Sequence, residues 1–138
     1  MKKIYIAMIL LVTLSCSKSK EEEVAVENNF SITGKWYIKE FVVNGILIPY
    51  DDHEPCGKDY FEFFGTNSVK SIDVFNCEEI TDWIGTYSKN GNTLIINTGT
   101  ETYNTEIIEL TAHSLIYKFN YDADGNGTID LVISKFDR

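Results

Sequence analysis

The chain has 138 residues, enough for one domain, and 21 acidic residues against 12 lysines and arginines give it a formal net charge of -9 at pH 7. A surface this acidic repels phosphate groups, which excludes nucleic acids and anionic lipid headgroups as expected partners. The acidity most simply serves solubility.

The first fifteen residues have the pattern of a secretory signal. Two lysines precede an apolar run over residues 4–14, and Cys16 follows after one small residue. The run is about half the roughly 20 residues that a membrane-spanning helix needs. The junction "TLSC" resembles a bacterial lipoprotein signal, which implies that Cys16 carries the lipid and becomes the new N-terminus. The alternative is an ordinary signal peptide with an incidental cysteine.

Three segments follow from this pattern. Residues 1–15 form the signal peptide, residues 16–30 form the lipidated N-terminus with a charged, flexible tether, and residues 31–138 form the folded domain. The acidic part of the tether resembles the surface-export signal of Bacteroidetes-type lipoproteins. We therefore expect a lipid-anchored protein of the outer membrane, facing the cell surface in preference to the periplasm.

The two remaining cysteines, Cys56 and Cys77, are expected to form a disulfide, because exported proteins fold in an oxidising compartment. A transition-metal site is the alternative, since His53 and three acidic residues precede Cys56 in "DDHEPC". No second histidine is close in the sequence, and an acidic loop that contains proline explains the run more simply.

Short runs with a period of two, separated by turn residues, dominate the rest of the chain and predict β-strands. Turn residues such as Asn44 and Gly45, which suit tight hairpins, lie between them. Each strand should therefore pair with the next. The predicted strands cover residues 35–43, 46–48, 59–64, 69–75, 83–88, 93–97, 102–110, 114–121 and 129–136.

A series of eight or nine antiparallel strands exposes two edges unless the sheet closes or packs against a second sheet. We therefore expect an all-β, up-and-down barrel of about eight strands, in preference to a curled sandwich. The alternating pattern predicts which side chains face inward. These are Phe61, Phe63, Tyr87, Leu94, Ile96, Ile107, Leu115, Tyr117, Phe119, Leu131 and Ile133.

The stretch "GKW" in the first predicted strand resembles the Gly-x-Trp opening of lipocalins. With the cysteine pair, the series of hairpins and the lipoprotein leader, it resembles the lipocalin-like domains of Bacteroidetes-type lipoproteins. The resemblance implies that Gly34 and Trp36 lie at the closed end of the barrel, with a cation packed over the indole. Arg138 is the first candidate for that cation, and Lys135 is the second.

The resemblance also implies a small hydrophobic or amphipathic ligand inside the barrel. The candidate ligand contacts are aromatic residues on the predicted strands, namely Phe61, Phe63, Trp83, Tyr87, Tyr117 and Phe119. Gly85, between two of these rings, leaves room for a ligand or for another stretch of backbone, or it marks a bend of the barrel. Aromatic residues on strands are more often core than ligand contacts, and small barrels are often filled by their own side chains.

The stretch "YDADGNGTID" has two interpretations. Aligned with a calcium-binding loop, it offers the ligand-type residues Asp122, Asp124, Asn126, Thr128 and Asp130. The position that needs a bidentate glutamate holds an isoleucine, and the flanking residues alternate as strands do. The stretch is therefore either an acidic hairpin turn or a hairpin that also binds Ca²⁺ weakly.

Catalysis has little support in the sequence, which lacks the common nucleophile, zinc and phosphate-loop motifs and has two histidines, both in predicted turns. We therefore do not expect an enzyme, and we expect a monomer. Two functions remain open. The protein either binds a small ligand in the barrel, or it engages a partner at the cell envelope through its outer surface while its interior is filled.

Overall fold

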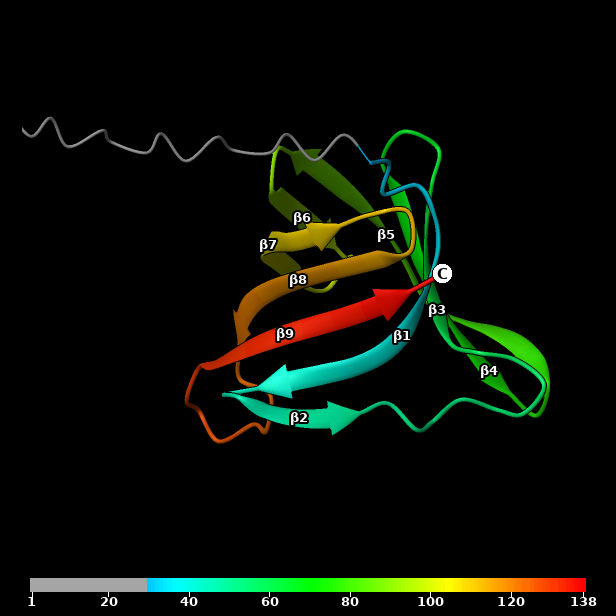
Figure 1. Ribbon diagram of the computed structural model, residues 1–138, viewed down its shortest axis with the longest axis horizontal. Helices are drawn as coiled ribbons and strands as arrows, with labels where there is room; N and C mark the ends of the chain where they lie inside the picture. Colours follow the sequence, from blue (N-terminus) through cyan, green and yellow to red (C-terminus); the bar gives the residue numbers. More distant parts are fainter. Residues whose placement is uncertain (1–29) are drawn as a thin grey trace, which may run out of the picture.

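The computed structural model describes residues 30–138, which form nine antiparallel strands joined in chain order (Figure 1). The strands lie close to the positions that the alternating pattern predicts, except that β5 begins at Glu78, five residues before the predicted run 83–88. They are β1 (Gly34–Val43), β2 (Ile46–Pro49), β3 (Tyr60–Phe64), β4 (Ser68–Phe75), β5 (Glu78–Asn90), β6 (Thr93–Asn97), β7 (Thr102–Leu110), β8 (Ser114–Tyr121) and β9 (Asp130–Asp137). None of the residues from 30 onward forms a helix that is long and apolar enough to cross a membrane.

The sheet closes because β1 pairs with β9 on one side and with β3 on the other. The short strand β2 pairs with β1 alone and stays outside the ring, so that the other eight strands form the barrel. The prediction of an all-β, antiparallel, up-and-down barrel is confirmed. Closure gives every strand of the ring two neighbours and removes the exposed edges of an open sheet.

The first hairpin is tied to the last one. Asn44 and Gly45 have φ angles of 50° and 84°, the positive values that a two-residue hairpin turn requires. The Asn44 side chain donates a hydrogen bond to Asp130 Oδ1 (2.6 Å) and accepts one from the backbone N–H of Leu131 (3.0 Å). The seam between β1 and β9 is thereby fixed at the end of the barrel where these two hairpins lie (Figure 1).

The core fills the opposite end of the barrel. Trp36, Phe63, Val69, Leu94 and Leu115 are fully buried there and belong to one hydrophobic cluster. Most side chains that the sequence predicts to face inward are buried or packed against this cluster. The interior is therefore filled by side chains at this end, which we call the closed end.

The predicted inward face of β9 is wrong. Leu131 is 45% exposed and Ile133 is half-buried, whereas Val132, Ser134 and Phe136 are buried. A period of two identifies the residues that share a face, but it does not say which face is inside. Leu131 and Ile133 share their face with the charged residues Lys135 and Asp137, which favour solvent, so this face lies outside and Val132 and Phe136 point inward.

Candidate functional site

The predicted disulfide between Cys56 and Cys77 is confirmed, with the two Cα atoms 5.6 Å apart. It joins the loop after β2 to the turn between β4 and β5. Nearby, His53 Nδ1 accepts a hydrogen bond from the backbone N–H of Asp59, and Nε2 donates one to the carbonyl of Ile38 (2.7 Å). Both ring nitrogens of His53 are thus hydrogen-bonded to backbone atoms, which gives this residue a structural role in the loop.

The buried carboxylate of Asp59 completes this loop. It accepts hydrogen bonds from the Tyr50 hydroxyl (2.5 Å) and from the backbone N–H of Val74 (2.7 Å). Burial and the hydrogen bond to Asp59 raise the pKa of Tyr50. The loop therefore stays attached to β4 through a buried polar network as well as through the disulfide.

At the closed end, Arg138 lies over the indole of Trp36, with its guanidinium carbon 3.9 Å from the ring centroid. The guanidinium also donates hydrogen bonds to the carbonyls of Ala112 (2.9 Å), Thr33 (3.0 Å) and Ser31 (3.4 Å). A Cβ on Gly34 would lie 3.0 Å from the guanidinium, so glycine leaves it room. The arginine therefore connects the start of the domain, the turn between β7 and β8 and the end of β9.

Lys135, the other candidate for this position, points elsewhere and donates a hydrogen bond to Glu40 (2.7 Å).

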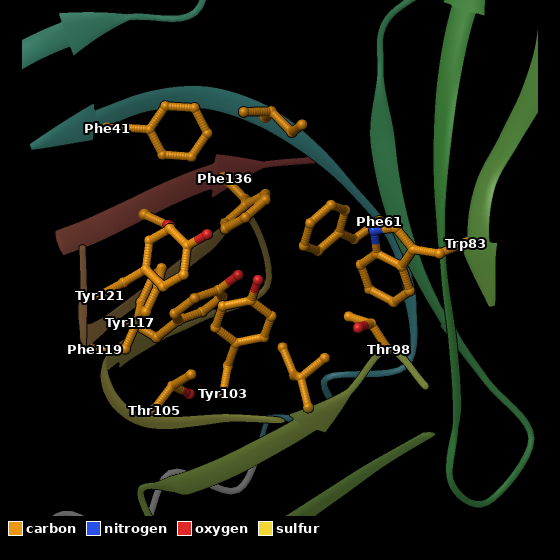
Figure 2. A pocket seen from close by; sticks show the side chains of 13 residues that line it. Phe41, Phe61, Trp83, Thr98, Tyr103, Thr105, Tyr117, Phe119, Tyr121 and Phe136 are labelled. Carbon is orange, nitrogen blue, oxygen red and sulfur yellow. The ribbon is translucent and has the colours of Figure 1, made fainter. Parts of the chain in front are cut away.

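The other end of the barrel contains a cavity of about 210 Å³, which we call the barrel cavity. Figure 2 shows its wall of aromatic rings, contributed by strands from all around the ring. The lining residues are Ile38, Phe41, Phe61, Trp83, Ile96, Thr98, Tyr103, Thr105, Tyr117, Phe119, Tyr121, Ser134 and Phe136. The barrel is therefore hollow at one end and filled at the other.

Hydroxyl groups supply the polar part of this wall. Tyr117 and Ser134 pair across β8 and β9, and burial raises the pKa of Tyr117. Burial also raises the pKa of Tyr103, together with a hydrogen bond that the phenol donates to the Glu101 carboxylate at the end of the cavity. The cavity therefore presents neutral hydroxyls to a ligand at pH 7.

The cavity contains four of the six aromatic residues predicted to contact a ligand, namely Phe61, Trp83, Tyr117 and Phe119. Phe63 and Tyr87 do not line it. Phe63 is fully buried in the core, and its ring packs edge-on against Tyr87 with the centroids 5.0 Å apart. Both residues therefore belong to the packed part of the barrel.

Gly85 also does not widen the cavity. A Cβ on this residue would lie 2.0 Å from the carbonyl oxygen of Asn97, so the glycine allows close approach of the backbone at the end of β6. Of the interpretations of this glycine, the structure shows the one in which another stretch of backbone takes the space.

Sequence reasoning missed several lining residues, above all Tyr103 and Tyr121. Both belong to alternating runs, since Tyr103 and Thr105 share the inner face of β7, and Tyr117, Phe119 and Tyr121 share that of β8. The pattern could place them inside the barrel. Which inward positions lie beside empty space depends on how the strands tilt around the ring.

A lipocalin-like domain model matches residues 32–117, more than half of the chain. The chain belongs to the lipocalin-like family. This family membership agrees with the resemblance that the Gly34 and Trp36 motif indicates. Members of the family are typically binding proteins and not enzymes. No curated protein matches the chain.

Two solved structures of Bacteroides proteins share this fold. A lipocalin-like protein from Bacteroides uniformis is 18% identical, with 77% of this chain and 96% of that chain covered and a TM-score of 0.53. An uncharacterized protein from Bacteroides eggerthii is 14% identical, with 78% and 99% covered and the same TM-score. At these identities the likeness concerns the fold.

The acidic loop of the lipocalin-like barrel, residues 122–129, connects β8 to β9. Carboxylate oxygens of Asp122, Asp124 and Asp130 lie within 4.8 Å of one another. Asp122 accepts hydrogen bonds from the backbone N–H groups of Asn126 (3.0 Å) and Gly127 (2.8 Å). These bonds are typical of a self-capped turn, and the three facing carboxylates are the oxygen ligands that Ca²⁺ uses. Both interpretations of the loop fit this geometry.

Asn126, another predicted ligand, lies beside this cluster, since its side-chain amide donates a hydrogen bond to Asp124 Oδ2 (2.8 Å). Its Oδ1 accepts a hydrogen bond from the backbone N–H of Thr128 (2.7 Å), the remaining predicted ligand. Cys16, the signal peptide of residues 1–15 and the tether up to residue 29 lie outside the described residues.

Proposed function

We propose that this protein binds a small hydrophobic or amphipathic molecule in the barrel cavity. The observation that carries the proposal is the cavity itself, a hollow of about 210 Å³ lined by aromatic rings and hydroxyls in a barrel whose other end is packed. Apolar pockets with a few polar groups are the usual form of a small-molecule site. The lipocalin-like fold commonly binds ligands of this kind.

The volume limits the size of the ligand. A buried apolar cavity of about 150 Å³ accommodates benzene, so a cavity of 210 Å³ suits a molecule of about one ring with a short substituent. A long acyl chain or a sterol needs more space than this. The ligand class is therefore a compact molecule and not a membrane lipid.

We also propose that binding, and not catalysis, is the activity. Both ring nitrogens of His53 are hydrogen-bonded to backbone groups, those of Ile38 and Asp59. His113 lies in the turn between β7 and β8, at the closed end and away from the cavity. Neither histidine is placed to exchange a proton with a molecule in the cavity.

A second candidate function is an interaction at the cell envelope through the outer surface. The observation that favours it is β2, where Ile46, Leu47 and Ile48 are 69%, 52% and 46% exposed. This strand pairs with β1 alone, so its other edge carries unpaired backbone groups. A partner could add a strand there.

The membrane anchor is part of the proposal. The signal pattern of residues 1–15 and the junction at Cys16 support a lipoprotein held at the outer membrane, at the cell surface or facing the periplasm. Mass spectrometry of the protein extracted from membranes should find an acylated peptide that begins at Cys16. Soluble, unacylated mature protein together with normal processing of a Cys16→Ala variant would refute the anchor.

Ligand binding can be tested by following Trp83 fluorescence during titration with a library of one-ring molecules. Trp83 lines the cavity, whereas Trp36 lies at the closed end, so a Trp83→Phe variant should lose the signal. An Ile96→Phe variant should abolish binding because its ring fills the cavity, and Ile96→Val is the matched control that keeps the cavity open. Absence of saturable binding across the library would favour the interaction function.

A further inference from the structure

We propose that the barrel cavity selects small organic cations, about one aromatic ring in size with a protonated amine, over carboxylates of the same size. This inference rests on the proposed function, because it names the ligand class of the same cavity. Three features carry it: a continuous series of rings, the direction of the hydroxyl hydrogen bonds, and the charge at the end of the cavity.

The rings form a connected series around the cavity (Figure 2). Phe61 packs 5.4 Å from both Trp83 and Phe136, and Phe136 lies 5.4 Å from Tyr117. The series continues through Phe119 and Tyr103 to Tyr121, with centroids 5.6 to 6.0 Å apart. The faces of aromatic rings carry negative potential, so a cation within about 6 Å of several faces is attracted without a buried counter-charge.

The hydroxyls near Glu101 are arranged to accept hydrogen bonds. The Tyr103 hydroxyl uses its proton in the bond to the Glu101 carboxylate, which leaves its oxygen lone pairs for a donor. Figure 2 shows the Tyr103 and Tyr121 hydroxyls close to the middle of the cavity. An ammonium group offers three donors to such acceptors, whereas a carboxylate offers none.

The carboxylate that accepts the Tyr103 hydrogen bond puts a negative charge next to the cavity wall. None of the thirteen residues that line the cavity carries a charge at neutral pH. Within residues 30–138, the ion pairs between lysines and carboxylates involve Glu40, Glu62, Glu79 and Glu106, and Glu101 is in none of them. A carboxylate ligand would lose its hydration in this cavity without meeting a cation, and Glu101 would repel it.

A matched set of three ligands tests the inference on the folded domain. Phenethylamine, phenethyl alcohol and phenylacetate have the same ring and nearly the same length, and at pH 7 they are positive, neutral and negative. Their dissociation constants can be measured by calorimetry at low salt. We expect the amine to bind about fivefold more tightly than the alcohol. We expect the alcohol to bind at least about tenfold more tightly than phenylacetate.

A Glu101→Gln variant separates the contribution of the charge. Its amide oxygen can still accept the Tyr103 hydrogen bond, so the preference for the amine over the alcohol should fall about threefold or more. Glu109→Gln is the control, because Glu109 is an exposed residue near the other end of β7 and should leave the preference unchanged. Added salt should weaken amine binding and leave alcohol binding nearly constant.

The outcomes separate the two proposals. If phenylacetate binds as tightly as the amine, or if Glu101→Gln leaves the preference unchanged, the cation selectivity is wrong although ligand binding stands. If none of the three molecules binds, and a wider library of one-ring molecules also fails, the proposed function is wrong together with this inference.

Discussion

Replacing Arg138 by alanine should destabilise the barrel by about 2 kcal/mol. The guanidinium lies 3.9 Å from the Trp36 ring centroid, a partly exposed cation–π contact that contributes about 1 kcal/mol. Its three hydrogen bonds to carbonyls are exposed to solvent, so water replaces them in the variant. We therefore assign them together about 1 kcal/mol, and not the larger value of buried charged bonds.

This loss can be measured by urea denaturation followed by tryptophan fluorescence, since Trp36 reports directly on the site. For a domain of this size, about 2 kcal/mol corresponds to a melting temperature lower by about 8 °C. An Arg138→Lys variant is the matched control. Lysine keeps the positive charge but lacks the planar guanidinium group with its several donors, so this variant should lose about half as much stability as the alanine variant. A loss below about 0.5 kcal/mol for Arg138→Ala would refute this account of the closed end.

Three further predictions concern the disulfide, the buried tyrosine and the acidic loop. Replacing both Cys56 and Cys77 by serine should lower the free energy of unfolding by about 3 kcal/mol, because the disulfide closes a loop of 21 residues in the unfolded chain. Urea midpoints of the parent protein with and without reductant would check this, and equal midpoints would contradict it. Burial raises the pKa of Tyr117, so above about pH 10 the unfolded chain ionises first and stability falls with pH by up to about 1.4 kcal/mol per pH unit from this residue. Tyr117→Phe should make the decline shallower between pH 10 and 11, and an identical decline would show that Tyr117 is not its source. The calcium hypothesis predicts that millimolar Ca²⁺ raises the melting temperature of the parent protein and not that of a variant with Asp122→Ala and Asp124→Ala. An unchanged melting temperature of the parent would show that the loop is an ordinary hairpin turn.

The strands, the turns and the ring topology could be predicted because they depend on local signals. Asn44 with Gly45 defines a hairpin, and alternation within 114–121 identifies the strand that is observed as β8. The cysteine pair was predictable because the leader pattern predicts export and assigns Cys16 to the lipid anchor, which leaves a single pairing for the other two cysteines.

The inner face of β9 and the extent of the cavity could not be predicted, because they depend on contacts between distant strands. Ser134 lies inside although Ile133 is more apolar, since Ser134 shares its face with Phe136 and Ile133 shares its face with the charged Lys135. Phe61 and Phe63 lie on the same face of β3, yet Phe63 belongs to the core and Phe61 lines the cavity. The difference is a matter of depth along the barrel axis, and alternation carries no information about depth.

The seam between β1 and β9 has a consequence for the order of folding. The hydrogen bond between Asn44 and Asp130 joins residues 86 positions apart, and the pairing of β1 with β9 joins the first strand to the last. Closing a loop of that length is slow, and it cannot begin before the final strand has been synthesised. The emerging chain can form its consecutive hairpins one after another, but it remains an open ribbon. The barrel cavity therefore does not form until β9 has been synthesised and has paired with β1.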